Sequence, residues 1–301
     1  MITAYINKVK NNKYLMGTVY VGVGSIFAAF FSYLLQFVFG RILSVADFGA
    51  FNALISLSYL FGVPAGVFGV SLVKYVSELS SRGEMKKLTA LYWKLAAISL
   101  GIGLLAFILI FSIKEIISDG LQIFDKPAVA MFGLTMGMAF FGAISPGYLQ
   151  GLLRYKAYAF YNVAASAFRL VLAVLGVVTG FGLAGAFGGM IVASLAAFGT
   201  AFLLIKKNLT VFENQDLKSD YKKILYFSLP VMFVHFGLMF LNNIDVILVK
   251  KYFDPDMAGY YAGTVTLGKI FLFGAGAVAT VMFPTISSLA EIGRASCRER
   301  V

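Results

Sequence analysis

Charged side chains are scarce in this chain. They make up 13% of its 301 residues, while 60% of the residues are hydrophobic. Soluble globular domains average about 25% charged and about 45–50% apolar residues. A water-soluble fold of this length could not bury so much apolar side chain with so little charge. Soluble enzymes, disordered tails and disulfide scaffolds are therefore excluded as classes, and the sequence predicts an integral membrane protein.

Cysteine and histidine are also nearly absent, with one of each, Cys297 and His235. Cys297 lies in the segment 292–301, whose sequence IGRASCRERV is similar to the in-frame translation of a common sequencing adapter. We therefore expect 292–301 to be a non-native tail on a truncated chain. Without this tail no thiol remains, and one histidine with no paired partner makes no metal site. The sequence predicts no catalytic residue, no metal and no cofactor.

A helix that spans a membrane needs about 20 mostly apolar residues. The chain has eight such stretches, at about 15–39, 48–73, 89–112, 127–152, 159–180, 183–205, 225–249 and 259–289. A short glycine turn at 180–183 would join the fifth and sixth spans as antiparallel neighbours. Kinks are expected in spans two, four, seven and eight, at Pro64, Pro146, Pro230 and Pro284.

The predicted fold is thus an all-α polytopic membrane protein with about eight transmembrane helices. Residues 1–205 would form a six-helix N-terminal lobe and 206–224 a cytoplasmic linker. Residues 225–291 would form the first two helices of a second lobe.

The formal net charge of +11 would suggest a nucleic-acid partner in a soluble protein. In a membrane protein, such an excess indicates Lys and Arg residues that anchor cytoplasmic loops. With the N-terminus inside, the cytoplasmic segments hold fourteen basic residues and the opposite side five. We therefore expect a cytoplasmic N-terminus, the lipid bilayer as surroundings, and no nucleic-acid partner.

The sequence contains an internal similarity. A shift of 210 residues places the segment 41–51 on 251–261, and each copy has a basic residue, an apolar pair, an acidic turn, and then a glycine and an aromatic residue. Six spans separate the copies, so both would cross the membrane in the same direction. This is the parallel-repeat layout of some secondary transporters. The alternative is a chance similarity between two short loops.

Three motifs connect the chain to a known family: FGRIL at 39–43, SVADFG at 44–49 and LNNIDVILV at 241–249. Together with the order of the spans, they resemble the Wzx-type polysaccharide-biosynthesis flippases of the multidrug/oligosaccharidyl-lipid/polysaccharide exporter superfamily. The resemblance extends over 1–291. It implies two six-helix lobes, the cytoplasmic membrane of a prokaryote, and an anionic lipid-linked saccharide as the cargo.

Arg169 lies near the middle of the fifth predicted span, and Lys269 lies deep in the eighth. A charge at membrane depth costs roughly 2.5–3.5 kcal/mol, so such residues usually face a cavity or a partner. A guanidinium offers a fixed fork of donors that suits phosphate. We expect Arg169 to hold the pyrophosphate of the cargo, and Lys269 to add a second cation from the opposite lobe. The alternatives are an ion pair or hydrogen-bond hub at Arg169, and pairing of Lys269 with Asp245.

Asp245 follows Asn242 and Asn243 near the outer end of the seventh span. A carboxylate beside amide oxygens is a candidate for proton or Na⁺ coupling; the alternative is an acid that caps a helix or pairs with Lys250. His235 lies in the same span. Histidine ordinarily titrates near neutral pH, which suits a proton relay, although a packing role is the alternative. Three further polar residues are candidates for lining a hydrophilic cavity: Gln36, Gln150 and Asn162.

The leading prediction is a flippase that moves a lipid-linked oligosaccharide by alternating access and is not an enzyme. A multidrug exporter of the same superfamily is the first alternative, but its cationic substrates would favour an acidic cavity. A membrane-embedded glycan-processing enzyme is the second. Such an enzyme needs convergent acid, base or metal ligands, and the predicted outer loops are too short to supply them.

Overall fold

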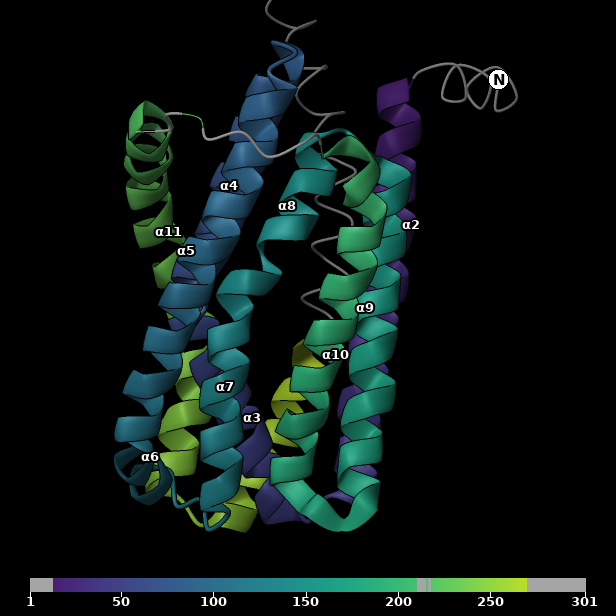
Figure 1. Ribbon diagram of the computed structural model, residues 1–301. Helices are drawn as coiled ribbons and strands as arrows, with labels where there is room; N and C mark the ends of the chain where they lie inside the picture. Colours follow the sequence, from purple (N-terminus) through teal and green to yellow (C-terminus); the bar gives the residue numbers. More distant parts are fainter. Residues whose placement is uncertain (1–12, 210–214, 216–217, 270–301) are drawn as a thin grey trace, which may run out of the picture.

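The computed structural model describes residues 13–209, 215 and 218–269, which fold into helices with no strand among them (Figure 1). The prediction of an all-α polytopic fold is confirmed. The expected tail and most of the expected eighth span lie outside the described residues. In chain order the α-helices are α2 Lys13–Ile42, α3 Val45–Phe61, α4 Val63–Ser81, α5 Met85–Ser112, α6 Lys114–Gly120, α7 Lys126–Gly142, α8 Ile144–Gly151, α9 Tyr155–Gly176, α10 Gly182–Ile205, α11 Lys218–Tyr252 and a helix over 255–269.

The surface of the bundle suits lipid. On α5, for example, Leu100, Leu104 and Leu109 are each 59% exposed, and rows of exposed leucines along a long helix need an apolar solvent. Five described helices are long and apolar enough to cross a membrane, or six if the bent pair α3–α4 counts as one span.

One of these five is a stretch of 54 residues, Tyr155–Asn208, and it folds back on itself. Gly180 and Gly182 have φ angles of 91° and 53°, which side chains disfavour and glycine adopts freely. The chain reverses there, so α9 and α10 lie side by side (Figure 1). The expected glycine turn is therefore present. The expected total of about eight spans is not confirmed, because the eighth lies largely outside the described residues.

Breaks divide the second and fourth spans where prolines were expected to bend them. Gly62 closes α3, Pro64 lies in the first turn of α4, and the two helix axes differ by 48°. In the fourth span α7 ends at Gly142, and Pro146 lies near the start of α8. Pro230 lies inside α11. Pro284 lies outside the described residues.

The turns after α2 and α11 lie at one end of the bundle, which we call the turn end. The opposite end, with the turns at 82–84 and 152–154, is the linker end (Figure 1). Each end has its own buried cluster. At the turn end, Phe51 packs against Phe39 and Phe187 with ring centroids 4.8 and 5.6 Å apart. At the linker end, the Tyr148 hydroxyl donates to the Leu88 carbonyl at 2.9 Å.

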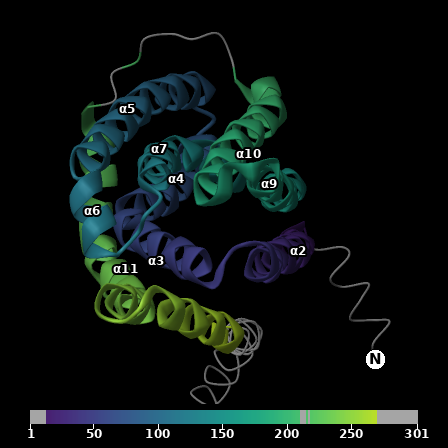
Figure 2. The same ribbon diagram turned by 90° about the horizontal axis from the view of Figure 1, so that it is seen from below.

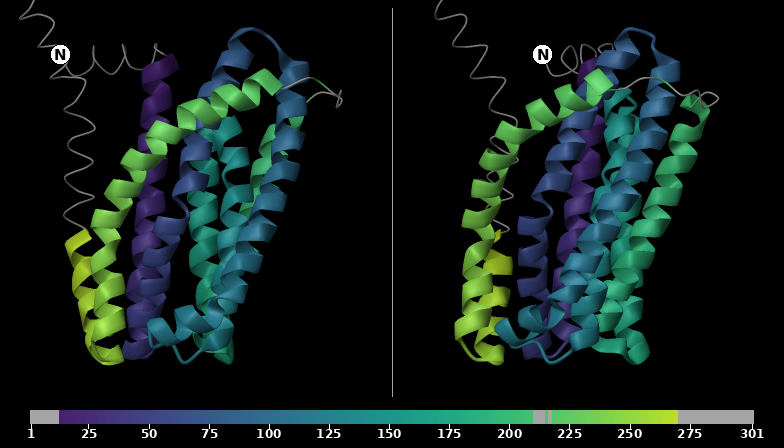
Figure 3. Two further views of the ribbon diagram at one scale, coloured as in Figure 1. Left: turned by 90° about the vertical axis from the view of Figure 1, so that its left-hand side faces the viewer. Right: turned by 60° about the vertical axis from the view of Figure 1, so that its left-hand side comes forward.

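Helix α11 begins at Lys218, inside the segment expected to be a linker. It curves along the height of the bundle (Figure 3), against α3 near the turn end and α4 near the linker end. At the turn end the chain then enters the 255–269 helix, which lies near α2 and α3 when the bundle is seen from below (Figure 2).

The shift of 210 residues found in the sequence also relates the backbones of two helix–turn–helix units. Helix α2 ends at Ile42 and α11 at Tyr252, and the following helices begin at Val45 and at 255. The hydrogen bonds correspond too. Residues 43 and 253 donate to the carbonyls of 39 and 249, at 3.0 Å in each case. We call 13–61 and 218–269 the first and second repeat units.

Candidate functional site

Two cavities lie in the middle of the bundle, between the buried clusters of its two ends. The lobe cavity, of about 420 Å³, has walls from α3, α4, α7, α9 and α10. The axial cavity, of about 330 Å³, has walls from α2, α3, α9 and α10 and from the second repeat unit. Four residues line both and therefore mark their junction: Ile55, Tyr59, Arg169 and Met190.

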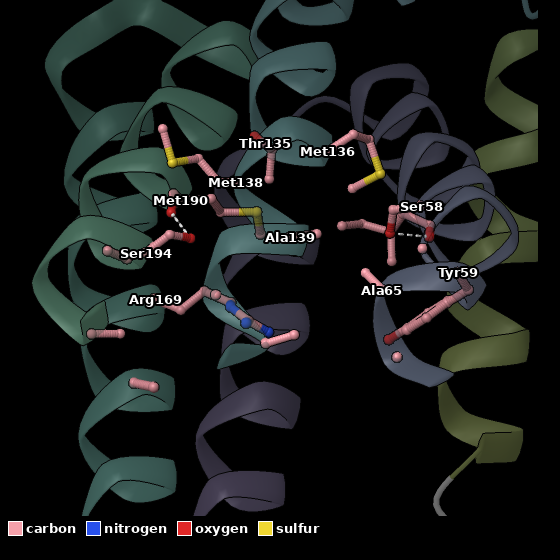
Figure 4. Close-up of a pocket in the computed structure, with 18 of the residues that line it drawn as sticks. Ser58, Tyr59, Ala65, Thr135, Met136, Met138, Ala139, Arg169, Met190 and Ser194 are labelled. Atoms are coloured by element: carbon pink, nitrogen blue, oxygen red, sulfur yellow. Dashed lines mark hydrogen bonds between the residues drawn. The ribbon is translucent and has the colours of Figure 1, made fainter. Parts of the chain in front are cut away.

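Arg169 reaches this junction because of its position on α9. Tyr161, Ala165 and Arg169 are spaced by four residues and so share one helix face, which lines the lobe cavity. On another face, Gly176 and Gly185 let α9 and α10 approach backbone to backbone. Figure 4 shows the guanidinium extending into the cavity. Within the described residues Arg169 has no ion pair, so the ion-pair alternative finds no partner there.

Lys269 lines the axial cavity together with Arg169, so the structure brings the two predicted cations to one cavity from different helices. The Lys269 ammonium donates to Asn243 Oδ1 at 3.4 Å and lies 5.9 Å from the centroid of the Tyr59 ring. In the described part of the chain it forms no direct ion pair with Asp245. Lys269 therefore lines the cavity without a carboxylate of the described chain in direct contact with its ammonium.

Asp245 lies beside this site without lining either cavity. Its Oδ2 accepts a hydrogen bond from the Tyr261 hydroxyl at 2.9 Å, and its Oδ1 is buried with no hydrogen-bond partner. Neither a pairing with Lys250 nor a helix cap is seen for Asp245 among the described residues.

The structure separates the other two residues expected to act in ion coupling. Asn242 is exposed, and its amide donates to the Leu238 carbonyl at 2.7 Å. The adjacent Asn243, 3% exposed, occupies the place beside Lys269 instead. His235 faces Gly66 of α4: a Cβ added to Gly66 would lie 4.0 Å from His235 Nε2. Ten residues of helix, roughly 15 Å, separate it from Asp245, so the structure does not bring the two together.

The axial cavity has a polar lining that includes several residues not singled out from the sequence. Gln36 lines it, as expected, whereas Gln150 and Asn162 line neither cavity. Sequence reasoning missed Tyr59, Asn52, Ser56 and Thr266. Among the described residues that line the two cavities, none is Asp, Glu, His or Cys. The lining therefore combines two cations with neutral hydrogen-bonding groups and offers no acid–base pair.

The residues of the axial cavity are related by the repeat. The second repeat unit contributes Val246, Ala262, Val265, Thr266 and Lys269. Subtracting 210 gives Gln36, Asn52, Ile55, Ser56 and Tyr59, all of which also line the cavity. A cavity lined by both members of each pair lies on the axis that relates the two units. Lys269 and Tyr59 are also 210 residues apart. Applying the repeat shift to Lys269 would therefore have identified Tyr59 from the sequence.

Comparison with known proteins places the chain in a family. The sequence profile of the family described as "Polysaccharide biosynthesis protein" matches residues 14–290. No curated protein matches the chain.

Several solved structures share the fold. A transporter of the MOP superfamily from Pyrococcus furiosus, described as having a binding pocket of reverse polarity, is 14% identical with a TM-score of 0.63, over 89% of this chain and 71% of that one. An outward-facing multidrug resistance MATE transporter of the same superfamily is also 14% identical with a TM-score of 0.63, over 90% and 73%. A MATE protein in complex with Br-NRF is 15% identical with a TM-score of 0.58, over 90% and 74%. At these identities the similarity establishes the fold. The chain has the fold of MOP superfamily transporters, and it belongs to the polysaccharide biosynthesis protein family.

Proposed function

We propose that this protein translocates an anionic lipid-linked saccharide, a polysaccharide precursor, across the cytoplasmic membrane of a prokaryote by alternating access. The observation that carries the proposal is Arg169, a guanidinium at the junction of two cavities with no carboxylate paired to it in the described chain. The family and the transporter fold also support a role in transport for polysaccharide biosynthesis.

The two cations suit a diphosphate. The Arg169 guanidinium can donate two parallel hydrogen bonds to one phosphate group, while Lys269 acts as a point charge on the other wall of the axial cavity. The volumes of about 420 and 330 Å³ fall within the range of ordinary ligand sites. The saccharide head would occupy the cavities, and the lipid chain would stay in the bilayer.

The lining argues against the two alternatives. A site for cationic drugs gains affinity from acidic residues, and a glycan-processing enzyme needs an acid, a base or a metal ligand. The described lining residues of both cavities supply neither. The function that we propose is translocation without a chemical step.

Transport against a gradient needs a coupling ion, and we propose that Asp245 binds this ion. Burial leaves its Oδ1 without a partner, and a proton or Na⁺ would satisfy that oxygen.

The expected orientation, with a cytoplasmic N-terminus, puts the linker end inside and the turn end outside. In that orientation the two repeat units touch on the outside.

The experiment is translocation of a fluorescent lipid-linked oligosaccharide by the complete protein in proteoliposomes. We expect Arg169→Ala to lower the rate at least about tenfold, because a hydrogen bond to a charged group contributes roughly 1.5–3 kcal/mol. Arg169→Lys keeps the positive charge but loses the paired donors of the guanidinium, so its rate should lie between those of the wild type and Arg169→Ala. Arg82→Ala is the matched control, since Arg82 forms an exposed pair with Glu78 far from the cavities. Wild-type transport by Arg169→Ala, or export of cationic drugs in place of the lipid, would overturn the proposal.

A further inference from the structure

Equivalent positions of the axial cavity differ in chemistry between the two repeat units. Gln36 of the first unit corresponds to Val246 of the second, and Asn52 corresponds to Ala262. Ile55 and Ser56 have close counterparts in Val265 and Thr266. The first unit thus presents amides where the second presents small apolar side chains.

The fold does not require these amides. The two units have the same helix ends and the same hydrogen bonds at their turns, and the second is built with valine and alanine at the same places. An amide in a mostly apolar protein carries a desolvation penalty unless it is bonded. Its presence on one wall only indicates a role toward something inside the cavity.

The hydrogen bonds of the amides leave acceptors free. Gln36 Oε1 is buried and has no hydrogen-bond partner. Asn52 uses Nδ2 to donate to the Phe48 carbonyl at 3.0 Å, which leaves its Oδ1 to accept from a ligand. Gln36 Oε1 therefore needs a donor that the described protein does not provide, and Asn52 Oδ1 can accept one from a ligand.

Tyr59 completes this wall. It corresponds to Lys269, lines both cavities and is 49% exposed. In Figure 4 its ring points from α3 toward Arg169 across the lobe cavity. An aromatic ring with a hydroxyl offers a flat apolar face and a polar edge, and a sugar ring presents matching apolar faces and hydroxyl edges.

We propose that Gln36, Asn52 and Tyr59 form a saccharide-recognising wall, which binds the sugar attached to the diphosphate that Arg169 and Lys269 hold. The inference rests on the proposed function and adds specificity to it. Sugar hydroxyls donate to the free amide oxygens, and the ring of the sugar lies on Tyr59. A lipid diphosphate that carries no sugar makes none of these contacts.

The test compares two ligands on the complete protein in lipid nanodiscs: a polyprenyl diphosphate that carries a sugar and the same lipid diphosphate without it. The substitutions Gln36→Val and Asn52→Ala install the residues that the second unit already has at these positions. We expect each to weaken binding of the glycosylated lipid about three- to tenfold, the range of one lost hydrogen bond. Binding of the bare lipid diphosphate should stay within about twofold, because Arg169 and Lys269 are intact.

Gln150→Val is the matched control, because Gln150 lines neither cavity. The preference for the glycosylated lipid is the deciding readout, since general destabilisation would weaken both ligands together. A preserved preference in Gln36→Val and Asn52→Ala, or an equal loss for both ligands, would overturn the saccharide wall. Wild-type protein that binds neither lipid would instead overturn the proposed function, so the two failures are distinguishable.

Discussion

Gly49 and Gly259 lie 210 residues apart in the chain, and their backbones touch at the turn end. A Cβ on Gly49 would lie 2.8 Å from the backbone nitrogen of Gly259, and a Cβ on Gly259 would overlap the carbonyl oxygen of Val45. The two glycines are also equivalent under the repeat. In a two-fold arrangement, residues at the axis meet their own counterparts, so this contact fixes where the axis passes. Tyr59 and Lys269 are a second such pair.

We expect Gly259→Ala to force the two repeat units apart at the turn end. The added methyl overlaps backbone rather than a flexible side chain, and overpacking of this kind typically costs about 1–3 kcal/mol. The measurement is the distance between spin labels at positions 42 and 252, which are exposed equivalents. The distance should increase in the complete protein.

Gly263→Ala is the control for this prediction. Gly263 lies one turn further along the same helix, and a Cβ there meets nothing within 4 Å. An unchanged distance in Gly259→Ala would mean that the contact between Gly49 and Gly259 does not set the separation of the two repeat units at the turn end.

A second prediction concerns the packing that orients Arg169. A Cβ on Gly185 would overlap the carbonyl oxygen of Gly176, so alanine at 185 must push α10 away from α9. We expect Gly185→Ala to lower the free energy of unfolding by about 1–3 kcal/mol. Thermal unfolding in detergent measures it. Gly188→Ala on the same helix, where a Cβ meets nothing within 4 Å, should be at least as stable as the wild type, because alanine favours the helix more than glycine does. Equal effects of the two substitutions would contradict the close approach.

The sequence predicted the all-helical membrane fold because each described span is a long apolar run between polar turns. It also predicted the breaks near Pro64 and Pro146 and the reversal at Gly180, since proline and glycine act on the local backbone. The sequence did not predict that α11 begins at Lys218, because a polar helical turn has no apolar pattern to mark it.

The site was less accessible to sequence reasoning. Arg169 and Lys269 stand out as charges in apolar surroundings, but only the fold shows that both line one cavity. The choice between Asn242 and Asn243 depends on helix phase, since one residue rotates a side chain by about 100°. A role for Gln36 and Asn52 can be inferred only once the structure shows that their apolar counterparts line the same cavity.

A third prediction concerns Glu115 and Lys126, an exposed ion pair near the turn end. The hydrogen bond from Lys126 lowers the pKa of Glu115, and the charges of Lys126 and Lys114 act in the same direction. The stabilisation from this pair is present above the ordinary glutamate pKa and is lost as the pH falls through the lowered value. Carbon-13 NMR of labelled glutamate should show the pKa of Glu115 rising in Lys126→Met.

Lys114→Met is the matched comparison for that titration. Lys114 acts on Glu115 through its charge alone, and its ammonium lies 4.1 Å from the centroid of the Phe111 ring. Its removal should raise the pKa of Glu115 less than the removal of Lys126 does. An equal rise would mean that charge, rather than the hydrogen bond, dominates.

The last prediction addresses coupling. Asp245→Asn keeps the size of the side chain and removes its charge, and Asp245 lines neither cavity. We therefore expect the variant to bind the lipid-linked saccharide as the wild type does, while its transport no longer responds to an imposed proton or Na⁺ gradient. Proteoliposome transport with and without each gradient measures this. Tyr261→Phe removes the donor to Oδ2 but leaves the carboxylate, so its transport should keep the response at a shifted ion concentration. A full response in Asp245→Asn would place the coupling group elsewhere, because a neutral amide cannot exchange a proton or balance a cation.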